Sequence, residues 1–527
     1  MKKYLFCMLL AGACAASCGK FLEEYSQNAA YVESVNDLEE LLYGSCFLPG
    51  EGMSYLHLVA DESRELVIYS DPITTQTGLY FSKAGLHRWM QNPFSNYSET
   101  SAAGDEWDAF YKRISVLNSI LLNGEPFWGK GQDAQLAYVM GSCRFLRAWN
   151  YLMLVNIYGE AYDKNNPSRG IGIPYKTDPT IEETKFSRDN VGHVYDKIAE
   201  DLREAARLME IAPDPVFNTK VSVDACHALL SRVYLYMEQY DQAVASANRV
   251  NGRLWNIAGE YLTGKGESFL VTGNPEIIFA QGTPGLAGLF PGTGGSRMVS
   301  GSYVVSITSA AYVTDRDLEA LFDSNDARYS AFFARSYGVS QLVCRKYRAA
   351  LSPLIVETDP VTGNDVVIGP MNGEPLSETS SLRYAEVTLN KAEAQACMGD
   401  ETGAATTIAA FLSTRYALPP AIPAGKEELI RFIRLERQKE LCFEGHRWFD
   451  LRRYAVNSVL PQTKEIVHEY HDLQNTVVSI RGKFTLLPYN ETNKGSWIFP
   501  IPETVVDYCF PNLVNLDRAA GVVKTDY

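Results

Sequence analysis

The chain has 527 residues, of which 46% are hydrophobic, and it carries a formal net charge of -15. This composition indicates a folded protein, and the excess of acids disfavours binding to nucleic acid or to anionic lipid head groups. A neutral or basic ligand is therefore favoured.

The first residues have the layout of a bacterial secretory signal. Lys2 and Lys3 precede an apolar run over residues 4–16, and small residues come directly before Cys18. A cysteine just after the cleavage position predicts a lipoprotein, with residues 1–17 as the signal peptide and Cys18 as the lipidated residue. Cys14 is a competing cleavage site. No later segment reaches the roughly 18 apolar residues of a membrane span, so we expect the mature body to be tethered by lipid alone.

Apolar residues recur at intervals of three and four along the next part of the chain. This periodicity predicts helices over residues 105–123 and 133–158, and a third helix after a cap at Asp189-Asn190. Residues 221–250 are interpreted as two helices joined at residues 239–241.

Residues 255–373 differ from the flanking segments, because they are rich in glycine, proline and β-branched residues. Such a composition predicts loops with short strands. Beyond it, residues 382–396 and 404–415 predict another helix pair with a turn at residues 399–400, and residues 427–443 predict one more helix.

The predicted helix pairs resemble tetratricopeptide units, three or more of which can stack into one core. We therefore predict a mostly α protein with a single domain over residues 18–527. Its helical repeat scaffold covers about 35–253 and 380–455, and its loop-rich, ligand-facing region covers about 255–373. Loops on a rigid scaffold are where a binding site is expected.

Opposite charges at helical spacing fill residues 434–453. Arg437, Glu440 and Glu444 share one face of the predicted helix, Gly445 is expected to end it, and Arg447 and Asp450 follow. These acids could be interpreted as a catalytic pair, but each has an arginine within reach, which keeps a carboxylate ionised. We predict that the five charged residues form structural ion pairs.

The same stretch resembles the R-x-x-E-L-x-F-E-G-x-R-x-F-D-L-R-R signature of the SusD/RagB family of outer-membrane nutrient-binding lipoproteins. Residues 144–151, which read R-F-L-R-A-W-N-Y, and residues 188–202 and 499–502 are similar to other landmarks of that family. The resemblance therefore spans nearly the whole chain.

This resemblance implies a SusD-like fold in which tetratricopeptide-like pairs form a right-handed superhelical scaffold. It also implies a position at the cell surface, on the outer membrane, with a SusC-like TonB-dependent transporter as partner. In such pairs the lipoprotein captures an oligosaccharide or, in some members, a peptide, and delivers it to the transporter.

Sugars present apolar faces ringed by hydroxyls, so a capture site needs exposed aromatic platforms beside hydrogen-bonding groups. The segment from residue 80 to residue 92 supplies both, and its candidates are Tyr80, Arg88, Trp89 and Asn92. The alternative interpretation is that Trp89 belongs to the core.

Two further sets of candidates follow. Residues 290–303 are interpreted as a loop in which Arg297 and Tyr303 grip a ligand, with an ordinary surface loop as the alternative. Asp61, Glu62 and Arg64 in an early loop come third.

Three functions compete. Capture and delivery of an oligosaccharide predicts binding without turnover, whereas a glycoside hydrolase needs two carboxylates, one with a raised pKa. The third function is an envelope scaffold that binds other proteins through its helical repeats. The seven cysteines after Cys18 and the scattered histidines lack metal-ligand spacing, so no metal or cofactor is predicted.

Overall fold

The computed structural model describes most of the chain. The described residues are 32–48, 53–65, 83–94, 106–180, 183–261, 269–285, 293–299, 302–307, 312–337, 342–344, 346–347, 356–358, 365–367, 376–474 and 477–527. The proposed signal peptide, Cys14, Cys18 and Tyr80 lie outside these ranges.

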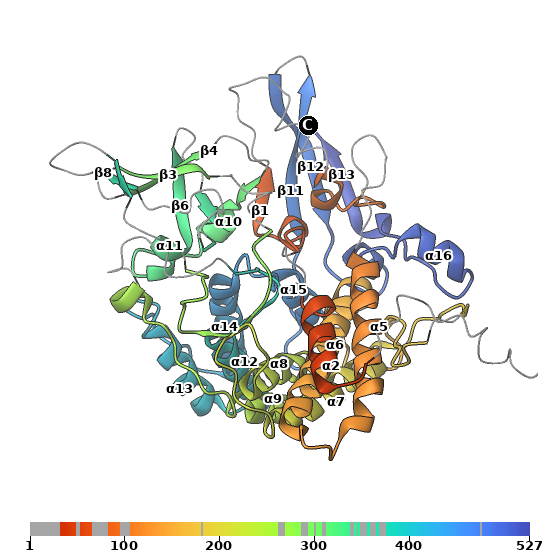
Figure 1. Ribbon diagram of the computed structural model, residues 1–527. Helices are drawn as coiled ribbons and strands as arrows, with labels where there is room; N and C mark the ends of the chain where they lie inside the picture. Colours follow the sequence, from red (N-terminus) through yellow and green to blue (C-terminus); the bar gives the residue numbers. More distant parts are fainter. Residues whose placement is uncertain are drawn as a thin grey trace, which may run out of the picture.

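Long helices form one half of the molecule and strands rise from it, as Figure 1 shows. The main helices are α2 (Val35–Ser45), α5 (Glu106–Gly124), α6 (Asp133–Tyr158), α7 (Val191–Met209), α8 (Val223–Tyr236), α9 (Tyr240–Ala247), α12 (Tyr384–Met398), α13 (Glu401–Leu412), α14 (Lys426–Leu441) and α15 (Arg447–Ala455). Shorter helical segments are α3 (Leu56–Val59), α10 (Arg316–Glu319), α11 (Ala327–Phe332), α16 (Glu503–Cys509), η1 (Glu125–Phe127), η2 (Ile257–Tyr261), η4 (Lys494–Trp497) and η5 (Ala519–Gly521).

The helices pack as a continuous series. Helix α6 contacts α5 and α7, α7 contacts α8, and α8 contacts α9, while α12 contacts α9 and α13. Helices from the two halves of the chain therefore share one apolar core. The predicted stacking of helix pairs and the mostly α fold are confirmed.

Helix α6 lies inside this stack. It is buried around nearly its whole circumference, from Leu136 to Tyr158, as expected of a helix that is apolar on all sides. Phe145 on α6 contacts Phe279 edge to face, which links the helix to the strand region. Long-range aromatic contacts of this kind contribute to the core beyond simple burial.

The local signals in the sequence account for several helix ends. The Asn190 side chain caps α7 by accepting a hydrogen bond from His193 N at 2.8 Å, and Gly399 ends α12 in the left-handed conformation, with φ 88°. Helix α14, however, ends at Leu441 and not at Gly445. The backbone leaves the helical conformation at Cys442, where ψ is 139°, and the Lys346 ammonium group donates to Glu440 O and Cys442 O, which satisfies these carbonyl groups without a further helical turn.

The strands form small sheets. A three-stranded antiparallel sheet contains β11 (Ile466–Gln474), β12 (Val477–Leu486) and β13 (Val522–Asp526). A four-stranded sheet has the order β3 (Thr293–Val299), β4 (Ser302–Ile307), β6 (Phe333–Tyr337) and β7 (Leu342–Cys344), with β4 and β6 parallel. Two-stranded pairs are β1 (Ser63–Glu65) with β5 (Tyr312–Thr314), β2 (Ile277–Ala280) with β10 (Ser381–Arg383), and β8 (Val356–Thr358) with β9 (Asp365–Val367).

Candidate functional site

The charged stretch at residues 434–453 lies in the core. Glu440 accepts hydrogen bonds from Arg383 at 2.5 Å and from Arg415 at 2.9 Å, and the same two arginines bind Glu276. All four side chains are at most 1% exposed. Burial alone would raise the pKa of Glu440, but Arg415 and Arg383 hold it well below its usual range.

The other four residues of the charged motif also form buried ion pairs. Glu444 binds Arg383 at 2.7 Å and Lys346 at 2.6 Å. The remaining pairs are Arg437 with Asp450 at 2.8 Å and Arg447 with Asp61 at 2.7 Å. The partners of the two glutamates come from distant parts of the chain, so these ion pairs join separate segments of the fold.

The third set of sequence candidates belongs to the same framework. Asp61 is 8% exposed and binds both Arg447 and Lys464. Glu62 is 1% exposed and accepts hydrogen bonds from Phe443 N and from the His57 ring. The structure contradicts the ligand-binding interpretation of these two acids, because their oxygens bind the protein itself. Arg64 lies in β1, opposite Val313.

Trp89 is a core residue, which was the alternative interpretation of the sequence. Its side chain is 1% exposed, and its Nε1 donates to Val59 O at 3.0 Å. Its ring stacks on His468 with centroids 4.3 Å apart, and His87 stacks on His468 at 3.8 Å. The structure therefore contradicts an exposed stacking platform at Trp89, because β11 covers the ring.

Replacing Trp89 with phenylalanine is expected to lower the free energy of unfolding by about 1–3 kcal/mol, because the buried Val59 carbonyl group loses its donor. Urea unfolding of the variant measures this loss. Where the variant is folded, its ligand affinity is expected to equal that of the wild type. A loss of affinity without a loss of stability would contradict the assignment of Trp89 to the core.

Arg88, the neighbour of Trp89, points into a group of aromatic and polar side chains. Its guanidinium group lies 5.0 Å from the Tyr470 ring centre and 5.9 Å from that of Phe484, and it donates to Glu65 at 3.3 Å. Glu65 also contacts the His471 ring at 3.1 Å. We call these five residues the Arg88 cluster.

The Arg88 cluster reaches the surface at its edge. The Arg88 side chain is 12% exposed and that of His471 is 15% exposed. The neighbouring segment is held in place by Arg518, whose backbone N–H donates to Gln91 Oε1 and whose side chain donates to Met90 O. Asn92 beyond it is exposed. Arg88 and Asn92 are thus the sequence candidates that the structure leaves at a solvent boundary.

The candidates in the second set lie in a hairpin. Arg297 in β3 is opposite Val304, and Tyr303 in β4 is opposite Met298. The backbone at both positions is therefore extended and paired, which corrects the prediction of a loop there. Their side chains, like all of Tyr80, lie outside the described part of the structure.

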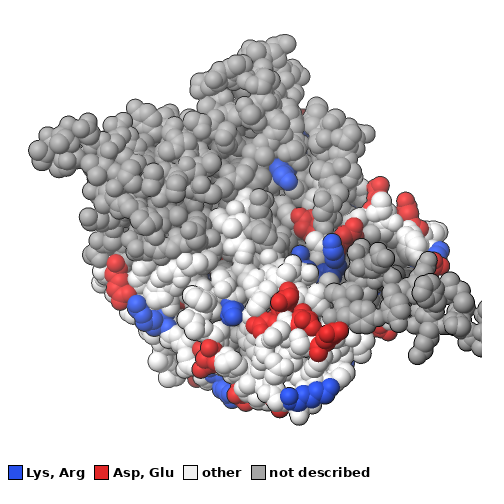
Figure 2. Space-filling model, viewed as in Figure 1, with Lys and Arg blue, Asp and Glu red and all other residues white. Residues whose placement is uncertain are grey.

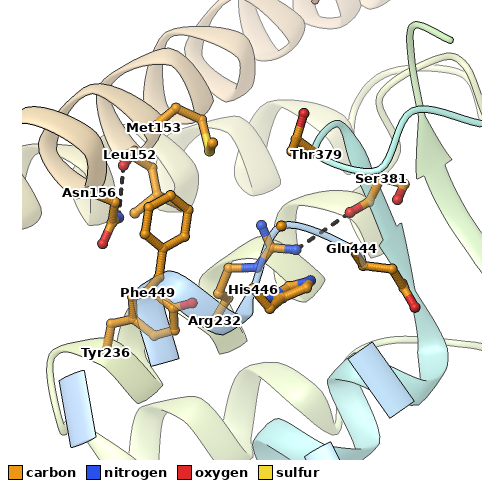
Figure 3. Close-up of a pocket in the computed structure, with 11 residues that line it drawn as sticks. Leu152, Met153, Asn156, Arg232, Tyr236, Thr379, Ser381, Glu444, His446 and Phe449 are labelled. Atoms are coloured by element: carbon orange, nitrogen blue, oxygen red, sulfur yellow. Dashed lines mark hydrogen bonds between the residues drawn. The ribbon is translucent and has the colours of Figure 1, made fainter. Parts of the chain in front are cut away.

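A small pocket with both polar and apolar walls opens beside the ion pairs (Figure 3). It is lined by Leu152, Met153, Asn156, Arg232, Tyr236, Thr379, Ser381, Glu444, Gly445, His446 and Phe449. The space inside it holds about one water-sized molecule. A sugar ring does not fit, so this pocket is not the candidate glycan site.

The surface that Figure 2 shows is of mixed charge. Lysine and arginine side chains alternate with acids over the described part of this face, without a continuous basic strip. Within the described ranges, no helix is long and apolar enough to cross a membrane, and no group of three or more metal-binding side chains occurs.

Sequence reasoning missed the part of the Arg88 cluster that the C-terminal sheet supplies. Ile466, His468 and Tyr470 are buried, whereas the residues between them are exposed. This alternation has the period of a half-buried strand and was a usable signal. The contact between this strand and the segment around Arg88 could not be predicted from the sequence, because nearly 400 residues separate the two.

Comparison with known proteins identifies the class. A family model described as "Starch-binding associating with outer membrane" matches residues 20–235, and a model described as "SusD family" matches residues 363–516. No curated protein sequence matches the chain.

Solved structures share the fold. A SusD superfamily protein from Bacteroides thetaiotaomicron is 19% identical, with a TM-score of 0.62, and the match covers 92% of this chain and 100% of that one. A SusD-like carbohydrate binding protein from Bacteroides vulgatus is 18% identical, with a TM-score of 0.58 and coverage of 91% and 97%. A SusD-like carbohydrate binding protein from Bacteroides fragilis is 15% identical, with a TM-score of 0.59 and coverage of 91% and 99%.

The fold is therefore that of the SusD-like proteins. The chain belongs to the SusD/RagB family, whose members are associated with the outer membrane.

Proposed function

We propose that this protein is a cell-surface lipoprotein, anchored through Cys18, that captures an oligosaccharide and delivers it to a SusC-like TonB-dependent transporter. The family match supports the outer-membrane location, and the fold shared with carbohydrate binding proteins supports a glycan ligand. The layout of Lys2, Lys3 and the apolar run before Cys18 supports the anchor.

The Arg88 cluster is the observation that carries the proposed ligand site. It joins the aromatic rings of Tyr470 and Phe484 to a guanidinium group and an imidazole at a solvent boundary. Sugar C–H faces contact aromatic rings, and sugar hydroxyls accept hydrogen bonds from arginine. Exposed Asn92 adds an amide that donates and accepts.

Binding without turnover is supported by the state of the buried acids. Glycoside hydrolysis needs one carboxyl with a raised pKa opposite a second carboxylate. The Glu440 pKa is held low by Arg415 and Arg383, and the Glu393 pKa is lowered to about 2 by Arg453 and Arg434 despite burial. Burial does raise the pKa of Asp315, but this side chain caps α10 by accepting from Asp317 N.

Replacing Arg88 with alanine is expected to weaken binding of the cognate glycan by roughly 10–100-fold, which corresponds to the loss of one or two hydrogen bonds from a charged donor. The measurement is isothermal titration of the protein that starts after Cys18 against a panel of neutral plant and host glycans. Asn92→Ala serves as a second variant, because its side chain is exposed and its loss should leave the fold intact.

Arg207→Ala is the matched control, since Arg207 is an exposed arginine on α7 that pairs with Glu204. Unchanged affinity in both Arg88→Ala and Asn92→Ala would place the site elsewhere. If the wild-type protein binds none of the glycans but binds members of a peptide panel, the ligand is a peptide and not a glycan. Release of reducing ends would contradict capture without turnover.

A further inference from the structure

The pocket in Figure 3 presents hydrogen-bond donors that the protein does not use. Arg232 binds Glu386 through Nε and Nη2, at 2.6 and 2.7 Å, so Nη1 is left over. Tyr236 Oη is buried and has no hydrogen-bond partner among the described residues. In Figure 3 the Tyr236 hydroxyl is directed toward Arg232.

The charges around this pocket do not balance. Arg232 pairs with Glu386, while Arg434 and Arg453 share Glu393, and Arg437 and Arg453 share Asp450. Four buried arginines therefore share three carboxylates, so the pairs in this group hold one more positive than negative charge. Arg453, which shares Glu393 with Arg434 and Asp450 with Arg437, lies over the Tyr236 ring at 5.3 Å, so this group of arginines is adjacent to the pocket.

The remaining lining does not cancel this charge. Glu444 is bound to Arg383 and Lys346, and its carboxylate is turned away from Arg232 in Figure 3. Burial and the nearby Arg232 hold the pKa of His446 well below its usual range, so the imidazole is neutral at neutral pH. Leu152, Met153 and Phe449 form apolar walls.

We propose that this pocket binds a small monovalent anion, with chloride as the physiological occupant. Buried positive charge in excess of the carboxylates that pair with it is costly, and a halide offsets this excess while accepting hydrogen bonds from Arg232 Nη1 and Tyr236 Oη. The space suits a single ion and excludes oxyanions with large organic groups. The bound ion would stabilise the contact between α8 and the segment that precedes α15.

Two measurements test this site. In crystals soaked in sodium bromide, anomalous scattering is expected to show bromide within hydrogen-bonding distance of Tyr236 Oη. In solution, the thermal midpoint is expected to rise saturably as chloride replaces gluconate at constant sodium concentration, because a ligand that binds only the folded state stabilises it.

Tyr236→Phe is expected to abolish the bromide peak and most of the chloride dependence. Tyr234→Phe is the matched control, because Tyr234 lies on the same helix, is buried and does not line the pocket; this variant should behave as the wild type. An ordered water without anomalous signal, or equal chloride dependence in both variants, would overturn the proposal.

Discussion

Replacing Glu440 with alanine is expected to lower the free energy of unfolding by about 3–5 kcal/mol, because removal of one partner from a buried ion pair leaves uncompensated charge. Glu440 is fully buried and bonds to both Arg383 and Arg415. Arg415 would then keep only Glu276 as a carboxylate partner, and Arg383 would keep Glu276 and Glu444. The loss is expected to be larger than that of a surface pair by several-fold.

Urea unfolding followed by circular dichroism measures this difference. Glu427→Ala is the matched control, since Glu427 lies on the same helix, is 67% exposed and pairs with Arg431. Its removal is expected to cost less than about 1 kcal/mol. Similar losses in the two variants would show that the buried pairs do not hold α14 to the strand region.

The helices could be predicted because their signals are local. Apolar residues at intervals of three and four predicted helices over residues 105–123 and 133–158, and the observed ends agree to within a residue or two. Asn190 and Gly399 mark helix ends because an asparagine side chain caps a helix start and glycine adopts the left-handed conformation at a helix end. Stacked helix pairs followed from small buried residues such as Ala225 and Ala243.

The partners of the charged motif could not be predicted in the same way. Helical spacing placed Arg437 and Glu440 near each other, but Arg437 binds Asp450 and Glu440 binds Arg383 and Arg415. The choice of partner depends on which helices pack together, and that is a property of the whole fold. The end of α14 at Leu441 could not be predicted for the same reason, because Lys346, which binds the carbonyl groups there, lies in a distant segment of the chain.

The candidate site was predicted only in part. The segment around Arg88 was chosen for its mixture of aromatic and polar residues, yet this mixture also suits a buried tryptophan with one hydrogen bond. Only the position of β11 decides that Trp89 is covered while Arg88 reaches the boundary. Tyr470 and Phe484 gave no functional signal, because isolated aromatics in strands usually pack in a core.

The free energy of unfolding is expected to fall as the pH drops from about 6.5 to about 4, because three histidines are buried in the neutral form. Burial, together with the stacked His468, holds the pKa of His87 well below its usual range. Burial lowers the pKa of His468 to about 4, although His87 O and Ala60 O oppose this shift. Burial and Arg232 lower the pKa of His446.

The sign follows from proton uptake. Below the unfolded pKa of about 6.5 the unfolded chain binds protons that the folded protein does not, so each histidine destabilises by up to about 1.4 kcal/mol per pH unit. Above pH 6.5 these histidines are neutral in both states and the full stability is present. As the pH falls from 6.5 to the folded pKa, stability is lost progressively. Three such groups give a combined slope of roughly 4 kcal/mol per unit. Below about pH 4.5, protonation of paired acids such as Glu393 adds to the loss.

Urea unfolding at pH 8, 7, 6 and 5 measures the slope. His468→Gln is expected to reduce it by about one third, because one titrating group is removed whatever the variant does to the absolute stability. His193→Gln is the same substitution at a surface position, since that side chain is 43% exposed on α7. Equal stability at pH 7 and pH 5 would contradict burial of the neutral histidines. A slope only about two thirds as steep would indicate instead that His468, whose two ring nitrogens face the carbonyl oxygens of His87 and Ala60, carries a proton in the folded protein.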